Sequence, residues 1–185
     1  MHAGTVRVCL QANHGFTLML LRLPLLAALL ATSAAAFAAA PTITLPDSKT
    51  VSLSERFLAK LPRQSVSATA HGKTARYGGY DLRAVLQAAG VSTVALRGRA
   101  MTTTVTVSAP DGYRVVFALS ELDPTLGNRH VLLADRENGQ QLPAKDGPWR
   151  LVLPTDSRPA RWERQVETIT VANTAPARRA SAPGS

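Results

Sequence analysis

The sequence predicts an α+β domain built on a mixed, mainly antiparallel sheet with a few short helices. The strongest helix signal, at residues 82–89, is outnumbered by segments with the alternating, β-branched composition of strands. Most of these segments lie in the second half of the chain, where turn residues connect them. Strands and helices do not alternate regularly and no internal repeat is present, so neither a doubly wound parallel sheet nor a solenoid is expected.

Three elements are expected before that helix. Residues 42–45 alternate polar and apolar side chains, which predicts a first strand. Residues 52–61 carry apolar side chains on one helical face, with Ser54 available to cap the start and Pro62 to end the helix. Residues 66–70 alternate again and predict a second strand.

The helix at residues 82–89 has both of its boundaries marked. Asp81 can cap its start, and Gly90 ends it. The glycine pair Gly78-Gly79 just before it permits a tight backbone. The expected buried stripe consists of Leu82, Val85, Leu86 and Ala89.

A β-hairpin is expected next. Residues 101–109 are rich in threonine and valine, and residues 113–118 return as a second strand. The turn between them is Pro110-Asp111-Gly112, whose residue types favour reversal of the chain. The remaining elements are a short helix or turn at 120–124, strands at 130–134, 151–154 and 166–171, and a loop over 156–164 that connects the last two strands.

The first 38 residues have the features of a secretory signal peptide. Arg22 precedes a short apolar run from Leu23 to Ala31, and Ala36-Phe37-Ala38 has the small-x-small pattern of a cleavage site. We therefore expect export to the periplasm, with cleavage near Ala38. Two alternatives are open, namely translation from Met19 and an uncleaved anchor, although the apolar run is short for a bilayer.

Residues 39–172 are expected to form one domain, because this length can bury a single core. Residues 173–185 are rich in alanine, proline and serine and are expected to be a disordered tail. Removal of the leader takes away two arginines and lowers the net charge from +9 to +7. The basic residues are scattered and not interleaved with aromatic residues, so no nucleic-acid partner is expected.

Cysteine and histidine content restricts the chemistry. The only cysteine is Cys9, which lies in the leader, so the expected mature domain has no disulfide and no thiolate ligand. The histidines of that domain, His71 and His130, are far apart in sequence and lack a third partner with ligand-like spacing, so no zinc site is expected. The absence of a nucleophile elbow argues against a hydrolase.

Several segments occur in the order found in sulfite oxidase-like proteins. They are 77–82 (YGGYDL), 109–113 (APDGY), 139–142 (GQQL) and 147–154 (GPWRLVLP), the last two within the stretch from Gln140 to Val171. Over residues 65–171 the sequence resembles the oxidoreductase molybdopterin-binding domain of this family, in particular its short exported members. The resemblance implies the fold of that domain and molybdopterin as a cofactor.

The resemblance also implies where a cofactor or another anion would bind. Arg150 follows Gly147-Pro148, where the larger enzymes also have an arginine, and Arg161 and Arg164 lie in the loop where the enzymes direct basic residues toward the pterin. Guanidinium groups are planar, permanently charged donors that suit phosphate. For each arginine, a solvated position or a pair with a carboxylate is the alternative. The candidate binding residues are Arg150, Arg161, Arg164 and Asp111, and no catalytic or metal-binding residue is singled out.

Two departures from the larger enzymes bear on function. The enzymes hold molybdenum through a cysteine thiolate, which the expected mature chain lacks, and they commonly have a histidine where this chain has Asp146. The sequence therefore favours a protein that binds an anionic ligand, a pterin or a redox partner without catalysis. The alternative is a periplasmic molybdopterin-dependent oxidoreductase with a substituted metal ligand such as Ser108, Asp111 or Asp156. A membrane redox or sensor protein is the candidate partner.

Overall fold

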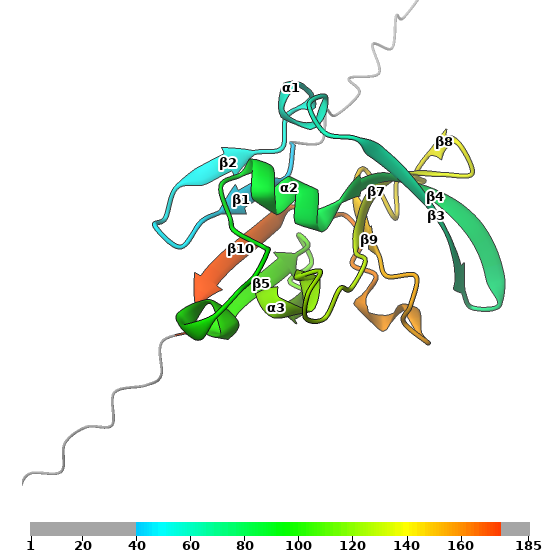
Figure 1. Cartoon of the computed structure of the whole chain (residues 1–185). Coiled ribbons are helices and arrows are strands. Elements are labelled where there is room, and N and C mark those ends of the chain that lie inside the picture. Colours follow the sequence, from blue (N-terminus) through cyan, green and yellow to red (C-terminus); the bar gives the residue numbers. More distant parts are fainter. Residues whose placement is uncertain (1–39, 175–185) are drawn as a thin grey trace, which may run out of the picture. The chain divides into compact units, whose positions relative to one another are not determined.

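The computed structural model describes residues 40–174, so the predicted signal peptide and residues 175–185 lie outside the described part of the chain. The described residues form two five-stranded sheets with a few short helices (Figure 1). The predicted α+β class, with mixed and mainly antiparallel strand pairing, is confirmed. The strands are divided between two sheets, which the sequence did not indicate.

The first sheet contains both the first and the last strand of the domain. Its order is β2-β1-β10-β5-β6; the pairing of β1 with β10 is parallel, and the other three pairings are antiparallel. The last strand therefore lies in the middle of the sheet. The strands are β1 (Thr42–Thr44), β2 (Thr50–Ser52), β5 (Thr103–Ser108), β6 (Arg114–Ala118) and β10 (Thr168–Asn173).

The second sheet is antiparallel throughout. Its order is β3-β4-β7-β8, and β9 also pairs with β7. The long β3–β4 hairpin, teal in Figure 1, extends beyond the neighbouring strands. The strands are β3 (Arg63–Ala70), β4 (Lys73–Asp81), β7 (Leu132–Glu137), β8 (Gln140–Gln141) and β9 (Arg150–Val152).

Helix α2 (Leu82–Ala88) forms as predicted. Asp81 Oδ1 accepts a hydrogen bond from the Arg83 backbone N–H at 2.7 Å, and Gly90 follows the helix with a φ of 96°. No helix in residues 40–174 is long and apolar enough to cross a membrane. The other helical segments are short: α1 (Glu55–Leu58), α3 (Leu119–Leu122), and the 3-10 turns η1 (Gly98–Thr102) and η2 (Pro159–Arg161).

Both sheets contribute to one hydrophobic core. Ile43, Phe117 and Ile169 of the first sheet and Leu132 and Leu151 of the second are fully buried members of the same cluster. This packing fixes β9 and the chain that follows it against the rest of the domain. The residues predicted to bind an anion are on these segments or beside them.

Several element boundaries differ from the sequence prediction, and two of these differences concern more than the end of a strand. The helix predicted at residues 52–61 is only one turn, because residues 50–52 form β2 against β1; its predicted cap is correct, since Ser54 Oγ accepts from the Phe57 N–H at 3.3 Å. The predicted start of the tail, residue 173, is too early. Strand β10 includes Asn173, and the Thr174 N–H donates to the Thr102 carbonyl at 3.2 Å.

Strand β4 was not expected from the sequence. The pair Gly78-Gly79 lies inside it, where its register with β7 shifts, and a Cβ on Gly79 would be 2.1 Å from the Leu133 carbonyl oxygen. Glycine is required at residue 79 because the two backbones approach so closely. The glycine pair was interpreted from the sequence as a source of local backbone freedom, but glycine at residue 79 is needed for β4 to pair with β7.

Candidate functional site

A cavity of about 910 Å³ lies between the β3–β4 hairpin and the loops around β9. We call it the Arg150 pocket. Three of the four predicted binding residues line it: Arg150, Arg164 and Asp111. Other lining residues include His71, Lys73 and Tyr77 from the β3–β4 hairpin, Tyr113 after the β5–β6 turn, Lys145 and Asp146 before β9, and Trp162 and Glu163 after it.

Arg150 is held in place by packing rather than by hydrogen bonds. Its side chain is only 12% exposed, and its guanidinium carbon lies 5.6 Å from the Trp162 ring centroid and 6.0 Å from that of Tyr77. Its nearest carboxylate oxygen, in Asp146, is 3.6 Å from Nη1. Nε of Arg150 is buried and has no hydrogen-bond partner among residues 40–174. Its two Nη atoms also donate no hydrogen bond to the described residues, so the guanidinium keeps donor capacity for a ligand.

Asp146 is shared between two arginines. Its Oδ1 lies 3.6 Å from Arg150 and 3.8 Å from Arg164, whereas its own side chain is only 10% exposed. Both distances exceed that of a hydrogen bond, so the acid orients the two guanidinium groups and uses little of their donor capacity. The Arg164 side chain is 58% exposed, so it can contact a ligand that enters the Arg150 pocket from solvent.

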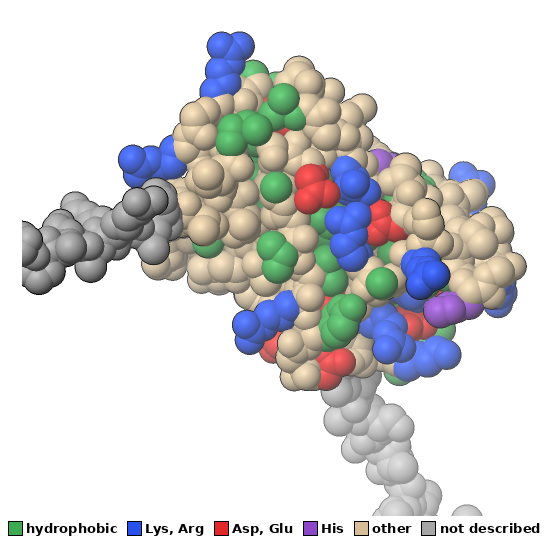
Figure 2. All heavy atoms as spheres, turned by 90° about the horizontal axis from the view of Figure 1, so that it is seen from below, with side chains coloured by type: hydrophobic (Ala, Val, Ile, Leu, Met, Phe, Trp, Pro, Cys, Tyr) green, Lys and Arg blue, Asp and Glu red, His purple; other side chains and the backbone are tan. Residues whose placement is uncertain are grey.

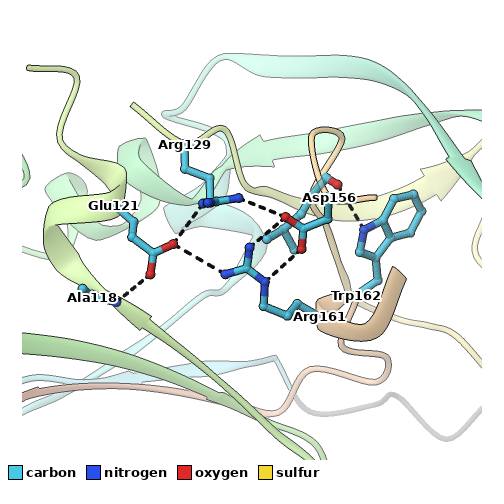
Figure 3. A network of polar contacts seen from close by, with 7 residues as sticks. Ala118, Glu121, Arg129, Asp156, Arg161 and Trp162 are labelled. Carbon is cyan, nitrogen blue, oxygen red and sulfur yellow. Dashed lines mark hydrogen bonds and ion pairs between the residues drawn. The ribbon is translucent and has the colours of Figure 1, made fainter. Parts of the chain in front are cut away.

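Arg161 does not join this pocket. Its Nε and Nη2 donate to the two oxygens of Asp156 at 2.9 and 2.7 Å, and Nη1 lies 3.5 Å from Glu121 Oε2 (Figure 3). The hydrogen-bonded Asp156 carboxylate raises the pKa of Arg161 above its ordinary value. Its guanidinium also lies 5.3 Å above the Phe117 ring. For Arg161 the structure favours the alternative of a carboxylate pair.

Arg129 completes this second cluster. It contacts Glu121 Oε2 and Asp156 Oδ1, each at 2.9 Å, so two arginines and two acids form a closed network (Figure 3). The other oxygen of Glu121 accepts from the Ala118 N–H at 3.0 Å. On the face seen in Figure 2, basic side chains likewise lie beside acidic ones and do not form one continuous positive surface.

Glu163 is a pocket residue that the sequence did not indicate. It is only 3% exposed, and its Oε2 is buried without a hydrogen-bond partner in the described part of the chain. Burial raises the pKa of this carboxyl above its ordinary value, and the nearby Asp111 carboxylate adds to the rise. No pattern marks one acid in a charged loop as buried, since the neighbouring Arg164 is exposed.

The aromatic residues form the wall of the pocket. Trp162 is buried, its Nε1 donates to the Leu153 carbonyl at 3.1 Å, and its ring meets Tyr77 edge to face with 5.5 Å between centroids. The Tyr113 hydroxyl donates to the Ala160 carbonyl at 2.8 Å, which joins the β5–β6 turn to η2. Asp111 stabilises that turn through a 2.9 Å bond from the Tyr113 N–H, so its predicted turn role is confirmed.

The two histidines have different surroundings. His71 is exposed at the hairpin turn and lines the pocket, whereas His130 Nε2 lies 2.9 Å from Gln64 Oε1 and 3.5 Å from Asp81 Oδ2. Within residues 40–174 no three His, Cys, Asp or Glu side chains are placed to hold a metal ion together.

Comparisons with known proteins agree with this fold. Residues 45–179 match the family described as the oxidoreductase molybdopterin binding domain, and the chain belongs to that family. No curated protein matches the chain.

Among solved structures, the chain is similar to the sulfane dehydrogenase SoxCD from Paracoccus pantotrophus. The TM-score is 0.56 at 19% sequence identity, and the match covers 73% of this chain and 38% of the other. At this identity the likeness establishes the fold alone. The chain thus corresponds to well under half of the length of that relative.

The pocket fits the organic, anionic part of a molybdopterin better than its metal. The Arg150 guanidinium, which lines the pocket and donates no hydrogen bond to residues 40–174, and the exposed Arg164 are suitable donors for a phosphate or a ring oxygen. The thiolate that the family resemblance implies as the molybdenum ligand has no counterpart, because the sequence from residue 40 to 174 contains no cysteine.

Proposed function

We propose that this protein is an exported member of its family that binds a small anionic ligand, such as a pterin or an oxyanion, in the Arg150 pocket without catalysing a redox reaction. One observation carries the proposal. Among the described residues, neither the Arg150 nor the Arg164 side chain donates a hydrogen bond. The Arg161 side chain, by contrast, donates its hydrogen bonds to acids. The first two arginines are thus positioned but not saturated.

The shape of the pocket supports the same ligand class. The Trp162 and Tyr77 rings pack beside the Arg150 guanidinium and restrict its movement, which reduces the entropy lost when it binds a ligand. A volume of about 910 Å³ accommodates a small organic anion. Burial raises the pKa of Glu163, which disfavours the charged carboxylate that would repel an anion.

The alternative function is a molybdopterin-dependent oxidoreductase with a substituted ligand. Of the three residues considered from the sequence, only Asp111 lines the pocket: Ser108 is not among its lining residues, and Asp156 has both of its oxygens bound to arginines. Asp111 is therefore the residue on which this alternative depends.

The two functions are separated by native mass spectrometry and metal analysis of protein purified from the periplasm of a host that makes molybdenum cofactor. We expect no stoichiometric molybdenum and an organic or inorganic anion as adduct. Molybdenum at one atom per chain that is lost in Asp111→Ala would overturn the proposal in favour of the enzyme.

The arginines are tested by calorimetric titration with sulfite, sulfate and a pterin monophosphate at low ionic strength. Arg164→Ala should weaken binding about tenfold, because one charge-assisted hydrogen bond is lost. Arg56→Ala removes an equal charge from the exposed side of α1 and should leave the affinity unchanged. Equal affinities of both variants and the wild type, or no binding by the wild type, would contradict the proposal.

Export is tested separately. N-terminal sequencing of the protein from a periplasmic extract should give a mature start near Ala39 if the leader is cleaved after Ala38. The partner proposed from the sequence, a membrane redox or sensor protein, should co-purify after cross-linking of intact cells. Recovery of the uncleaved chain from the cytoplasm would exclude both points.

A further inference from the structure

A second basic cavity lies on the opposite side of the β3–β4 hairpin from the Arg150 pocket. It has a volume of about 530 Å³. Side chains alternate between the two faces of a strand, so Lys73 and Tyr77 of β4 line the Arg150 pocket while Arg76 and Gly78 line this one. We call it the triple-arginine pocket. Its lining includes Arg63, Ser65, Arg76, Gly78, Arg136 and Asn138.

The strand register brings these residues together from distant parts of the sequence. Ser65 of β3 pairs with Gly78 of β4, and Gly78 pairs with Arg136 of β7, so three strands contribute to one row. Arg63 and Arg76 flank that row from β3 and β4. Three guanidinium groups consequently surround a position that has no side chain.

The charge of the pocket is only partly neutralised. Arg63 pairs with both oxygens of Asp135, with Nη1 at 3.1 Å from Oδ2. Arg76 instead uses its Nε to donate to Ser65 Oγ at 2.8 Å, and Arg136 Nη1 is 3.4 Å from the Gly139 carbonyl. In the stretch 40–174 neither Arg76 nor Arg136 has an ion pair. Two positive charges therefore remain available.

The pocket is also preorganised. Two hydrogen bonds fix Asn138 to β4. Its backbone N–H donates to the Arg76 carbonyl at 2.7 Å, and its side-chain Oδ1 accepts from the Arg76 backbone N–H at 2.9 Å. A Cβ on Gly78 would lie 3.7 Å from Arg136 Cβ and 4.0 Å from Arg63 Nη2. The glycine thus leaves the floor open between two of the arginines. A site whose donors are already in position loses less entropy on binding.

We infer that the triple-arginine pocket binds the phosphate or sulfate group of a ligand. Guanidinium groups match the oxygens of a tetrahedral oxyanion with parallel hydrogen bonds, and the Ser65 hydroxyl and the Asn138 amide add neutral donors. The oxyanion comes either from a free ion or from a lipid headgroup, since the pocket opens on exposed strand residues. This site is independent of the Arg150 pocket and of the ligand proposed there.

The test uses the whole exported chain and two kinds of probe at low ionic strength. Inorganic phosphate and sulfate are titrated by calorimetry, and vesicles of phosphatidylglycerol are compared with vesicles of phosphatidylcholine by co-sedimentation. Binding of the free ions identifies a soluble ligand; binding only to phosphatidylglycerol identifies a headgroup. Either outcome supports the inference if it depends on the arginines.

That dependence is measured with two variants. Arg76→Gln/Arg136→Gln removes two guanidinium groups and should weaken binding at least tenfold. Gly78→Val fills the floor of the pocket without changing the charge and should also weaken binding at least tenfold. Arg56→Gln/Arg114→Gln removes two exposed charges elsewhere and should bind as the wild type does. The pocket variants are also compared in an Arg164→Ala background, which weakens the Arg150 pocket, so that binding lost from one pocket is distinguishable from binding lost from the other. No binding to either probe, or equal binding by the pocket variants and the controls, would overturn the inference.

Discussion

Glu163 is the residue whose environment departs most from what its sequence suggests. Its carboxyl group is buried beside the guanidinium-lined pocket, and one oxygen has no partner in the described residues. Burial raises its pKa above the ordinary value of 4.5. An acid that binds protons more tightly in the folded state makes the fold less stable as pH rises, because the unfolded chain ionises first.

Glu163→Gln should therefore stabilise the protein above pH 4.5 and change little below it. The loss of stability in the wild type begins at the ordinary pKa and is complete only above the raised one. Glutamine keeps the oxygen that accepts from the Arg164 N–H and removes the cost of a buried charge, on the order of 1 kcal/mol at neutral pH. Urea denaturation across this pH range checks the prediction, and parallel pH profiles for the two proteins would contradict it.

The neighbouring glycines of β4 provide a prediction at the scale of the element. Gly79→Ala should destabilise the domain by more than about 4 kcal/mol or prevent folding, because its Cβ meets the Leu133 carbonyl at 2.1 Å and separates β4 from β7. Gly78→Ala should change stability by less than about 1 kcal/mol, since its nearest contact would be at 3.7 Å. Thermal and urea denaturation compare the stabilities of the two variants. Similar losses of stability would contradict the claim that the close contact between β4 and β7 requires glycine at residue 79.

These glycines also show what the sequence could and could not predict. The capped helix α2 and the β5–β6 hairpin were predicted, because their signals are local. Strand β4 was not, although its hairpin with β3 is local, because the pair Gly78-Gly79 is unusual inside a strand and the close approach that requires it involves β7, more than 50 positions away. Asp156 and Arg161, which pair with each other, lie five residues apart in the loop predicted over 156–164, whereas Glu121, which also binds Arg161, is 40 residues away.

At the scale of the whole molecule, the network of Glu121, Arg129, Asp156 and Arg161 connects α3, the approach to β7 and the chain after β9. Asp156 is its centre, with a side chain only 10% exposed. Asp156→Asn should lower the free energy of unfolding by about 1–3 kcal/mol, because both arginines lose their charged acceptor. Part of this difference should disappear at high salt.

The exposed pair of Asp47 and Lys49 provides the control for that experiment. Both side chains are more than half exposed, so Asp47→Asn should have no measurable effect on unfolding. A double-mutant cycle between Asp156 and Arg161 measures their coupling directly. A coupling energy near zero would mean that the network seen in Figure 3 contributes nothing to stability.

The parallel pairing of β1 with β10 determines when the domain can be completed. Without residues 168–173 the first sheet would lack the strand that joins its two hairpins, β1–β2 and β5–β6, because β10 pairs with both. Contacts between residues so far apart in sequence form slowly. The first sheet is therefore completed only when β10 joins it. A chain that ends before residue 168 would lack the central strand of that sheet.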